Sequence, residues 1–114
     1  MKAKVDFTEI GDISIVTYHG EMTFFFLEEV ENYLKNMIRD KKYKIIFDMT
    51  HVSWVDSMGL GLIAMVVKFA LLNGKKVCMV NVKENIYNLL RLSTISDLIN
   101  VYDNINEAVE FLKQ

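Results

Sequence analysis

At 114 residues, with 52% hydrophobic and 25% charged side chains, the chain has the size and composition of one soluble folded domain rather than a disordered segment. Its net charge of -2, with basic residues scattered along the sequence, argues against a nucleic-acid-binding surface. The single cysteine, Cys78, cannot form an internal disulfide, so nothing points to an oxidising compartment.

No segment of the sequence predicts export or membrane insertion. The stretch from Met1 to Asp6 has no apolar core of signal-peptide length. The longest apolar run, from Leu60 to Leu72, is interrupted by Lys68 and is too short to span a bilayer. The sequence therefore predicts a cytoplasmic protein without direct membrane insertion.

The chain begins with a pattern that predicts an antiparallel hairpin. Apolar and polar residues alternate from Ala3 to Thr8, as in a strand with one face exposed to water. Gly11-Asp12 suits a tight turn, and the β-branched run from Ile13 to Tyr18 predicts the second strand. The residues from Gly20 to Thr23 are expected to end that strand.

An amphipathic helix is expected next, capped by Thr23 and running from about Phe24 to Asp40, with its apolar side chains at helical spacing. The following strand, Tyr43 to Met49, has apolar residues on both faces, as expected at the centre of a parallel sheet. A polar loop is predicted between this strand and the next helix, which begins at Asp56-Ser57.

That next helix is predicted to end at Asn73-Gly74, because glycine suits the left-handed conformation that often follows a helix. Its residues from Leu60 to Leu72 are apolar nearly all round, so the helix is expected to be largely buried. Val77 to Val80 predicts a short buried strand, which completes a right-handed strand–helix–strand unit.

Three elements complete the chain: a helix from Asn85 to Leu92, a strand from Leu98 to Tyr102 and a helix from Ile105 to Leu112. Asn104, with Glu107 three residues later, resembles a capping box for the last helix. The resulting order, β-β-α-β-α-β-α-β-α, predicts a single α/β domain over residues 1–114. We expect a mixed, mostly parallel β-sheet of about five strands with about four helices.

The stretch Asp56-Ser57-Met58-Gly59-Leu60-Gly61 places a serine at the start of the long helix, after the strand that carries Asp48. A helix N-terminus collects unpaired N–H groups and positive dipole density. Ser57 either caps this helix, a contribution of about 1 kcal/mol, or is the target of chemistry. The residues alone leave both interpretations open.

This stretch resembles the Asp-Ser-x-Gly-Leu-Gly motif of anti-sigma factor antagonists in the STAS domain family. Further segments fall where that family has counterparts, namely Gly20-Glu21, Asn73-Gly74-Lys75 and Leu89-Leu90-Arg91-Leu92. The likeness therefore covers nearly the whole chain, with its elements in the expected order.

The resemblance implies a binding protein that is not an enzyme and has no cofactor or metal. In that family the domain binds an anti-sigma factor that is also an ATP-binding serine kinase, and so frees the sigma factor. The kinase phosphorylates the motif serine, here Ser57, and the phosphorylated form releases the kinase until a phosphoserine phosphatase resets it. The residues expected to contact the partner are Thr23, Phe24, Phe25, Asp56, Ser57, Met58, Gly59 and Leu60.

Two residues depart from the family pattern. Many relatives have Ser, Thr or Ala where this chain has Met58, so the neighbour of the acceptor is bulkier and apolar here. Relatives often carry aspartate where this chain has Thr23. The phenylalanines from Phe24 to Phe26 cannot all face the core of one helix, so at least one is expected to be exposed. It either contacts the partner, since aromatic residues are enriched at binding hot spots, or is an ordinary surface residue.

Comparing magnitudes indicates that phosphorylation of Ser57 acts on binding rather than on the fold. Phosphoserine adds about -1.5 to -2 charges. The helix dipole favours that charge by about 0.3–1 kcal/mol, while Asp56 repels it. A charge left unpaired in an interface costs several kcal/mol, and about 1.4 kcal/mol is tenfold in affinity.

The same residues allow two other functions. One is a stand-alone STAS subunit of a membrane transport complex, which would dock through the same surface. The other is an enzyme with Ser57 as nucleophile, but the sequence shows no basic partner and no evident oxyanion site. Asp48 and Asp56 could lie close together, yet no substrate cleft is indicated for a hydrolase pair.

Other residues have structural interpretations. Gly59 and Gly61 lie in the first turns of a helix, where glycine costs about 0.5–1 kcal/mol relative to alanine, and this indicates close packing against a neighbouring strand or a partner. Cys78, in a predicted buried strand, is expected to be a packed thiol. Trp54 is expected to anchor the loop over the sheet, or to contact the partner if it is exposed near Ser57.

The two histidines do not predict a metal site. His19 and His51 are single residues without a ligand cluster around them in the sequence. His51 is expected in the loop that follows the central strand.

Overall fold

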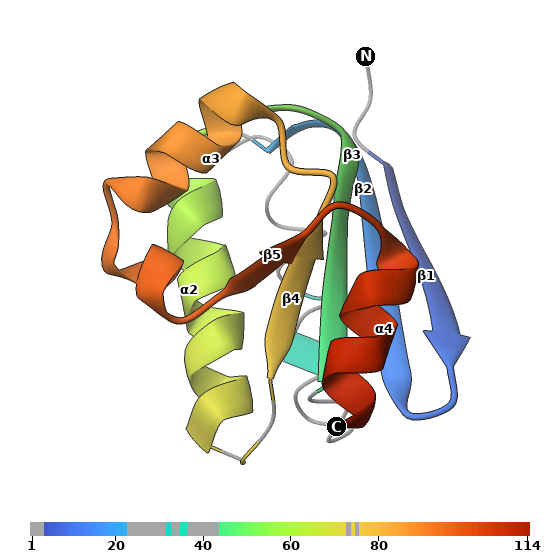
Figure 1. Cartoon of the computed structure of the whole chain (residues 1–114). Coiled ribbons are helices and arrows are strands. Elements are labelled where there is room, and N and C mark those ends of the chain that lie inside the picture. The colour runs from blue at the N-terminus through green and yellow to red at the C-terminus, as the bar shows by residue number, and fades with distance from the viewer. Residues whose placement is uncertain (1–3, 23–31, 33–34, 37–43, 73, 75) are drawn as a thin grey trace.

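The computed structural model describes residues 4–22, 32, 35–36, 44–72, 74 and 76–114. Over these residues the chain forms a five-stranded sheet, whose strands lie side by side in chain order (Figure 1). The strands are β1 (Lys4–Ile10), β2 (Ile13–Met22), β3 (Lys44–Val55), β4 (Val77–Val80) and β5 (Asn100–Tyr102). β1 is antiparallel to β2, and the other neighbouring pairs are parallel. The predicted mixed, mostly parallel sheet is confirmed.

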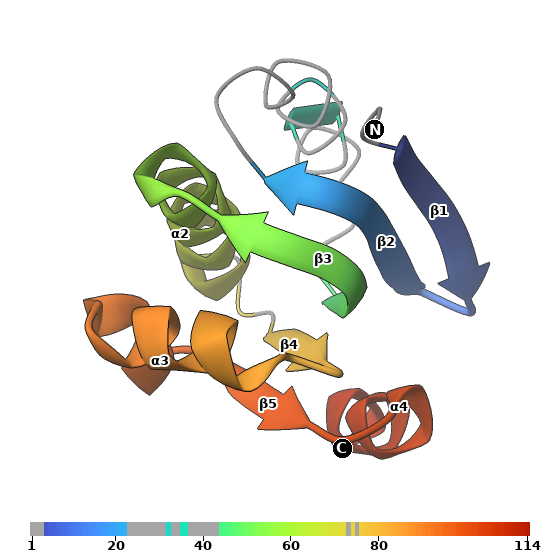
Figure 2. The same ribbon diagram turned by 90° about the horizontal axis from the view of Figure 1, so that it is seen from above.

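Helices cover both faces of this sheet. They are α2 (Ser57–Leu72), α3 (Glu84–Arg91), the short 3-10 helix η2 (Thr94–Asp97) and α4 (Ile105–Lys113). Figure 2 shows α2 and α3 on one side of the sheet and α4 on the other. In the part of the chain that the structure describes, no helix is long and apolar enough to cross a membrane.

The helix predicted from Phe24 to Asp40 lies outside the described residues, apart from three positions. Asn32, Lys35 and Asn36 are described, and each is helical. The element order is confirmed for the rest of the chain, with η2 as an addition that the sequence did not predict.

Two buried clusters pack against the two faces of the sheet. Alternate residues of β3 supply both, because successive side chains of a strand point to opposite faces. Phe47 joins the cluster that α2 and α3 cover, together with Ile63 and Ile86. Ile46 joins the cluster that α4 covers, together with Leu112. β3 is therefore the centre of the core, as its apolar pattern predicted.

The opening hairpin follows the prediction at its turn. β1 pairs with β2 from Lys4 opposite His19 to Ile10 opposite Ile13. Gly11 connects the strands with a φ of +60°, a left-handed conformation that glycine adopts without a steric cost.

Both central strands are longer than the sequence predicted. Gly20 does not end β2, because the strand continues to Met22, which pairs with Val55. The loop predicted after Met49 is likewise wrong, because β3 continues to Val55. β4 pairs with β3 only as far as Asp48. The last part of β3 therefore has β2 as its described strand neighbour, and its polar side chains face solvent.

The described side chains of α2 include both buried and exposed ones. Ile63 and Val67 are buried, whereas Lys68 and Leu72 are exposed. The expectation of a helix buried nearly all round is therefore wrong at Leu71 and Leu72, while the side chains at positions 62, 66, 69 and 70 lie outside the described residues. The predicted end is confirmed, because Gly74 has a φ of +71° and its N–H donates to a carbonyl of the last turn.

The C-terminal elements are close to their predicted positions. β5 begins at Asn100 rather than Leu98, because the Leu98 N–H instead closes the turn after η2 on the Ile95 carbonyl at 2.8 Å. The predicted cap of α4 is confirmed, since Asn104 Oδ1 accepts a hydrogen bond from the Glu107 N–H at 2.9 Å.

Candidate functional site

The predicted site lies where β3 ends and α2 begins. β3 ends at the buried Val55, Asp56 forms the connection, and Ser57 is the first residue of α2. Beyond the end of β4, the Lys83 ammonium donates a hydrogen bond to the Val52 carbonyl at 3.0 Å. Lys83 therefore satisfies a backbone group on the edge of β3 that β4 no longer reaches, and it steadies the strand that leads to Ser57.

Asp56, and not Ser57, is the N-cap of α2. Asp56 Oδ1 accepts a hydrogen bond from the Gly59 N–H at 2.9 Å, and the Asp56 carbonyl accepts the Leu60 N–H at 3.0 Å. The interpretation of Ser57 as the cap is therefore wrong, because the cap position lies one residue earlier. Ser57 is exposed, and no residue that the structure describes forms a hydrogen bond with its hydroxyl group.

The remaining predicted contact residues of the motif divide between the surface and the interior. Met58 is 52% exposed. Asp56 is half-buried, Gly59 is buried, and Leu60 packs against the core cluster under α2. Only Ser57 and Met58 therefore present their side chains to solvent, while the other three hold the first turn in place.

The first segment of the predicted partner surface cannot be compared with the structure. Thr23, Phe24 and Phe25 lie outside the described residues. The described residue nearest to them on the N-terminal side is Met22, which pairs with Val55 at the end of β3. The chain therefore leaves β2 beside the strand end that leads to Ser57.

Gly61 is open to solvent rather than packed. A Cβ atom built on Gly61 meets nothing within 4 Å, so the expected close approach of a neighbouring strand is wrong at this position. Gly61 lies one turn after Ser57, and residues four apart lie on the same side of a helix. The exposed surface at the start of α2 therefore continues over a position without a side chain.

Trp54 is an exposed residue near this surface that the sequence left undecided. It lies on β3 rather than in a loop, and it is 48% exposed. Large aromatic side chains are more often buried, so an exposed tryptophan close to a helix start indicates a contact surface. We call these three exposed residues, Trp54, Ser57 and Met58, which lie within five positions of one another in the sequence, the α2-start surface.

The other titratable candidates do not form a reactive centre. Cys78 is buried, as predicted, and burial raises the pKa of its thiol to about 11, although the nearby Lys76 ammonium acts in the opposite direction. Among the described residues no group of His, Cys, Asp and Glu could hold a metal ion. Asp48 accepts hydrogen bonds from Thr50 and stands far along β3 from Asp56, so the two aspartates do not meet.

The two histidines are neighbours, contrary to the expectation of isolated residues. His51 lies on β3 and not in a loop, and it pairs with His19 on β2. Their rings stack with centroids 4.6 Å apart, and His19 Nε2 lies 3.2 Å from Asp6 Oδ2. This cluster joins three strands across the sheet.

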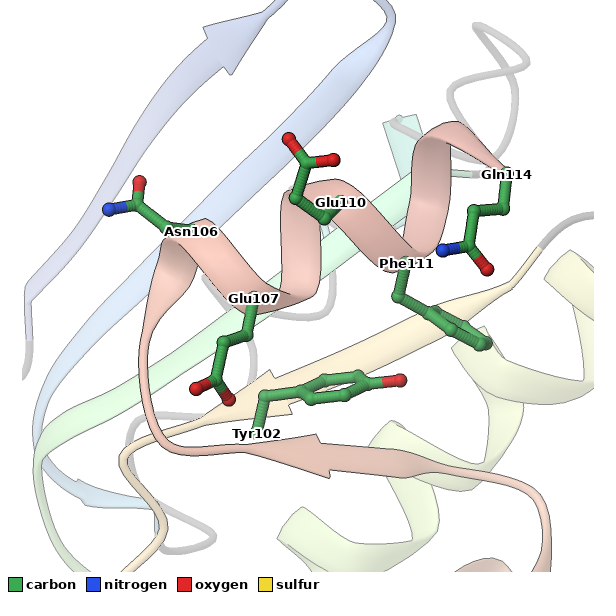
Figure 3. A pocket seen from close by; sticks show the side chains of 6 residues that line it. All are labelled: Tyr102, Asn106, Glu107, Glu110, Phe111 and Gln114. Atoms are coloured by element: carbon green, nitrogen blue, oxygen red, sulfur yellow. The ribbon is translucent and has the colours of Figure 1, made fainter.

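A cavity of about 500 Å³ lies on the α4 side of the sheet, away from the motif (Figure 3). Tyr102 of β5 and Phe111 of α4 lie next to each other in its lining, with ring centroids 5.5 Å apart. The Lys76 ammonium lies 4.5 Å from the centre of the Phe111 ring, an attractive cation–π contact. The ring contact joins α4 to β5, and the Lys76 contact joins α4 to the residue before β4. No predicted partner-binding residue that the structure describes lines the cavity.

The fold and the motif have counterparts in known proteins. The family model for the STAS domain matches residues 4–108. The chain belongs to the STAS domain family. The predicted resemblance is thereby confirmed, and the match extends from β1 into α4.

The proteins to which this STAS protein is similar include anti-sigma factor antagonists. The anti-sigma-B factor antagonist of Staphylococcus aureus is 28% identical over 110 residues, which cover 96% of this chain and 98% of that protein. A Thermotoga maritima protein proposed to be an anti-sigma factor antagonist has a TM-score of 0.91 at 21% identity, over 96% of this chain and 95% of that chain. Phosphorylated SpoIIAA of Bacillus has a TM-score of 0.77 at 14% identity, over 95% and 98%. The two structures show the shared fold.

Proposed function

We propose that this STAS protein is an anti-sigma factor antagonist, switched off by phosphorylation of Ser57. The observation that carries the proposal is an exposed Ser57 at the first position of α2, in a helix that Asp56 caps. Because the cap does not depend on the serine, Ser57 can be modified without loss of the hydrogen bond that stabilises the helix start. The Staphylococcus aureus relative supports the same activity.

The α2-start surface is the proposed binding site for the anti-sigma factor. Trp54 and Met58 are both about half exposed and flank Ser57 in sequence, so they offer apolar area that a partner would bury. Asp56, Gly59 and Leu60 position this surface from below. Thr23, Phe24 and Phe25 complete the proposed contact set on the segment that follows β2.

The proposed partner is an ATP-binding serine kinase that also holds a sigma factor. In the unphosphorylated state the STAS protein occupies the kinase and so frees the sigma factor. The kinase transfers a phosphoryl group from ATP to Ser57 Oγ, and a phosphoserine phosphatase removes it again. The STAS protein needs no cofactor and acts as substrate and ligand rather than as a catalyst.

The charge that phosphorylation adds costs more free energy in the complex than in the free protein, so it weakens binding. Phosphorylation adds about -1.5 to -2 charges next to Trp54 and Met58. In the free protein this charge stays in water at a helix N-terminus, where the dipole and Asp56 act in opposite directions by about 1 kcal/mol or less. In the complex an unpaired charge costs several kcal/mol, so the phosphorylated form dissociates.

The test is incubation of the full chain with ATP and its anti-sigma factor kinase, followed by mass spectrometry of the peptides. We expect one phosphate on the wild type and none on Ser57→Ala. Ser53→Ala is the matched control, because Ser53 is also an exposed serine, on β3 four residues before Ser57, and its variant should be phosphorylated normally. An unmodified wild type would contradict the switch and favour a subunit of a membrane transport complex.

A further inference from the structure

Met58 differs in exposure from the other methionines whose side chains the structure describes. Its side chain is 52% exposed, whereas Met49 and Met79 are 1% and 0% exposed and Met65 is half-buried. We propose that Met58 is a peroxide-sensitive modification site, whose oxidation weakens partner binding at the α2-start surface. The binding consequence rests on the proposed function, while the modification itself does not.

The chemistry requires a peroxide and an accessible thioether. The sulfur of Met58 attacks one oxygen of hydrogen peroxide, and an S–O bond forms as the O–O bond breaks. The departing hydroxide takes the proton of the transferred hydroxyl group and leaves as water. The sulfur is oxidised by two electrons and the peroxide is reduced by two, which gives methionine sulfoxide. Because no proton has to leave the sulfur first, the rate follows solvent access rather than a thiol pKa.

The thiol of Cys78, the most easily oxidised sulfur group among the described residues, is shielded from solvent. Cys78 is fully buried in β4, and a cysteine reacts with peroxides as the thiolate. Burial disfavours that charged form, so the reactive state of Cys78 is both inaccessible and scarcely populated. The sulfur atoms of Met49, Cys78 and Met79, on β3 and β4, are all buried and do not compete with Met58 for a peroxide in solution.

Oxidation of Met58 is expected to weaken partner binding because of where Met58 lies. Met58 follows Ser57 directly and lies in the first turn of α2, on the surface proposed to be buried by the partner. Oxidation turns an apolar, flexible side chain into a polar one. A polar sulfoxide buried without a hydrogen-bond partner weakens binding by roughly 5- to 100-fold. The fold is unaffected, since Met58 belongs to neither core cluster.

The first experiment maps oxidation directly. The folded full chain is treated with hydrogen peroxide, and sulfoxide at each methionine is followed by peptide mass spectrometry. We expect Met58 to react at least about tenfold faster than Met49 and Met79, with Cys78 unmodified, and the difference to vanish in urea. Equal rates in the folded protein, or faster reaction at Cys78, would overturn the site.

The second experiment measures the consequence, using the kinase identified by phosphorylation of Ser57. Affinity is measured before peroxide, after peroxide and after treatment with methionine sulfoxide reductase. The wild type and Met65→Leu should lose affinity 5- to 100-fold and regain it with the reductase. Met58→Leu, compared only with its own untreated sample, should not change. A response in Met58→Leu equal to that of the wild type would overturn the proposal.

The two hypotheses fail in different ways. If the untreated wild type does not bind the kinase, the proposed function and the binding consequence of oxidation both fall, and the peptide map alone then decides whether Met58 is the oxidation site. If the untreated wild type binds and the oxidised form binds equally well, only the regulatory role of Met58 is overturned.

Discussion

The starts of α2 and α4 are built alike but differ in what they expose. Each helix follows a strand and has a side-chain cap, with Asp56 accepting the Gly59 N–H and Asn104 accepting the Glu107 N–H, both at 2.9 Å. After its cap, α4 continues with the half-buried Ile105. The α4 start shows that a capped helix start is stable without a serine after the cap residue.

What distinguishes the start of α2 is the pair of exposed residues that follow the cap. Ser57 and Met58 face solvent, and Trp54 lies exposed on the strand before them. The cap at Asp56 stabilises the turn without help from Ser57 or Met58, so helix stability does not explain why a serine and a methionine occupy these exposed positions. Under the proposed function, these residues are exposed because a partner binds them.

Removing an exposed side chain at the start of α2 is expected to have its largest effect on partner affinity. Trp54→Ala should weaken binding of the anti-sigma factor by about 10- to 100-fold, because a tryptophan at the centre of an interface often contributes 2 kcal/mol or more. Titration calorimetry measures the effect. Tyr87→Ala is the control, since Tyr87 on α3 is 41% exposed but lies on another surface. Equal losses in the two variants would contradict a binding role specific to the α2 start.

A smaller effect tests the feature that the two helix starts share. Asp56→Ala and Asn104→Ala should each lower the free energy of unfolding by about 1 kcal/mol, because each removes an N-cap hydrogen bond. Urea denaturation followed by circular dichroism measures both. Ser57→Ala should leave the unfolding free energy nearly unchanged, and a loss as large as that of Asp56→Ala would restore Ser57 as the cap.

The smallest expected change has the opposite sign. Gly61→Ala should raise the free energy of unfolding by about 0.5–1 kcal/mol, because alanine is the better helix residue and its Cβ meets no other atom. The same variant should weaken partner binding if the partner approaches the backbone at this turn. Destabilisation in urea would show that the position is packed after all.

The sequence predicted the architecture because the periodic patterns are strong. The apolar run around Phe47 marked the central strand, and Gly11 and Gly74 marked the turn and the helix end that the structure shows. The family motif lies at the junction of β3 and α2, where Ser57 is exposed, and its role as the site stays a prediction. These features depend on residues close together in the chain, which a sequence displays directly.

The errors arose where distant segments decide the outcome. The polar residues after Met49 looked like a loop, but β2 pairs with them as far as Val55 and makes them a strand. The stacking of His19 on His51 depends on the register of β2 against β3, which no local pattern encodes.

The choice of cap was an error of a different kind. Asp56 and Ser57 are adjacent and both residue types are preferred at N-cap positions, so propensity could not separate them. Because the helix starts one residue earlier than a Ser57 cap would require, Asp56 is the N-cap and Ser57 is an exposed first residue of the helix. In the same turn Met58 is exposed and Gly59 is buried.

The most direct test of the central claim compares binding with folding for a charge at Ser57. Ser57→Asp and the control Ser53→Asp are titrated with the anti-sigma factor kinase, and circular dichroism is recorded for both. We expect Ser57→Asp to lose at least about tenfold in affinity with an unchanged spectrum, and Ser53→Asp to lose far less. Unchanged affinity of Ser57→Asp would contradict the account, as would a loss of affinity that follows a loss of helix.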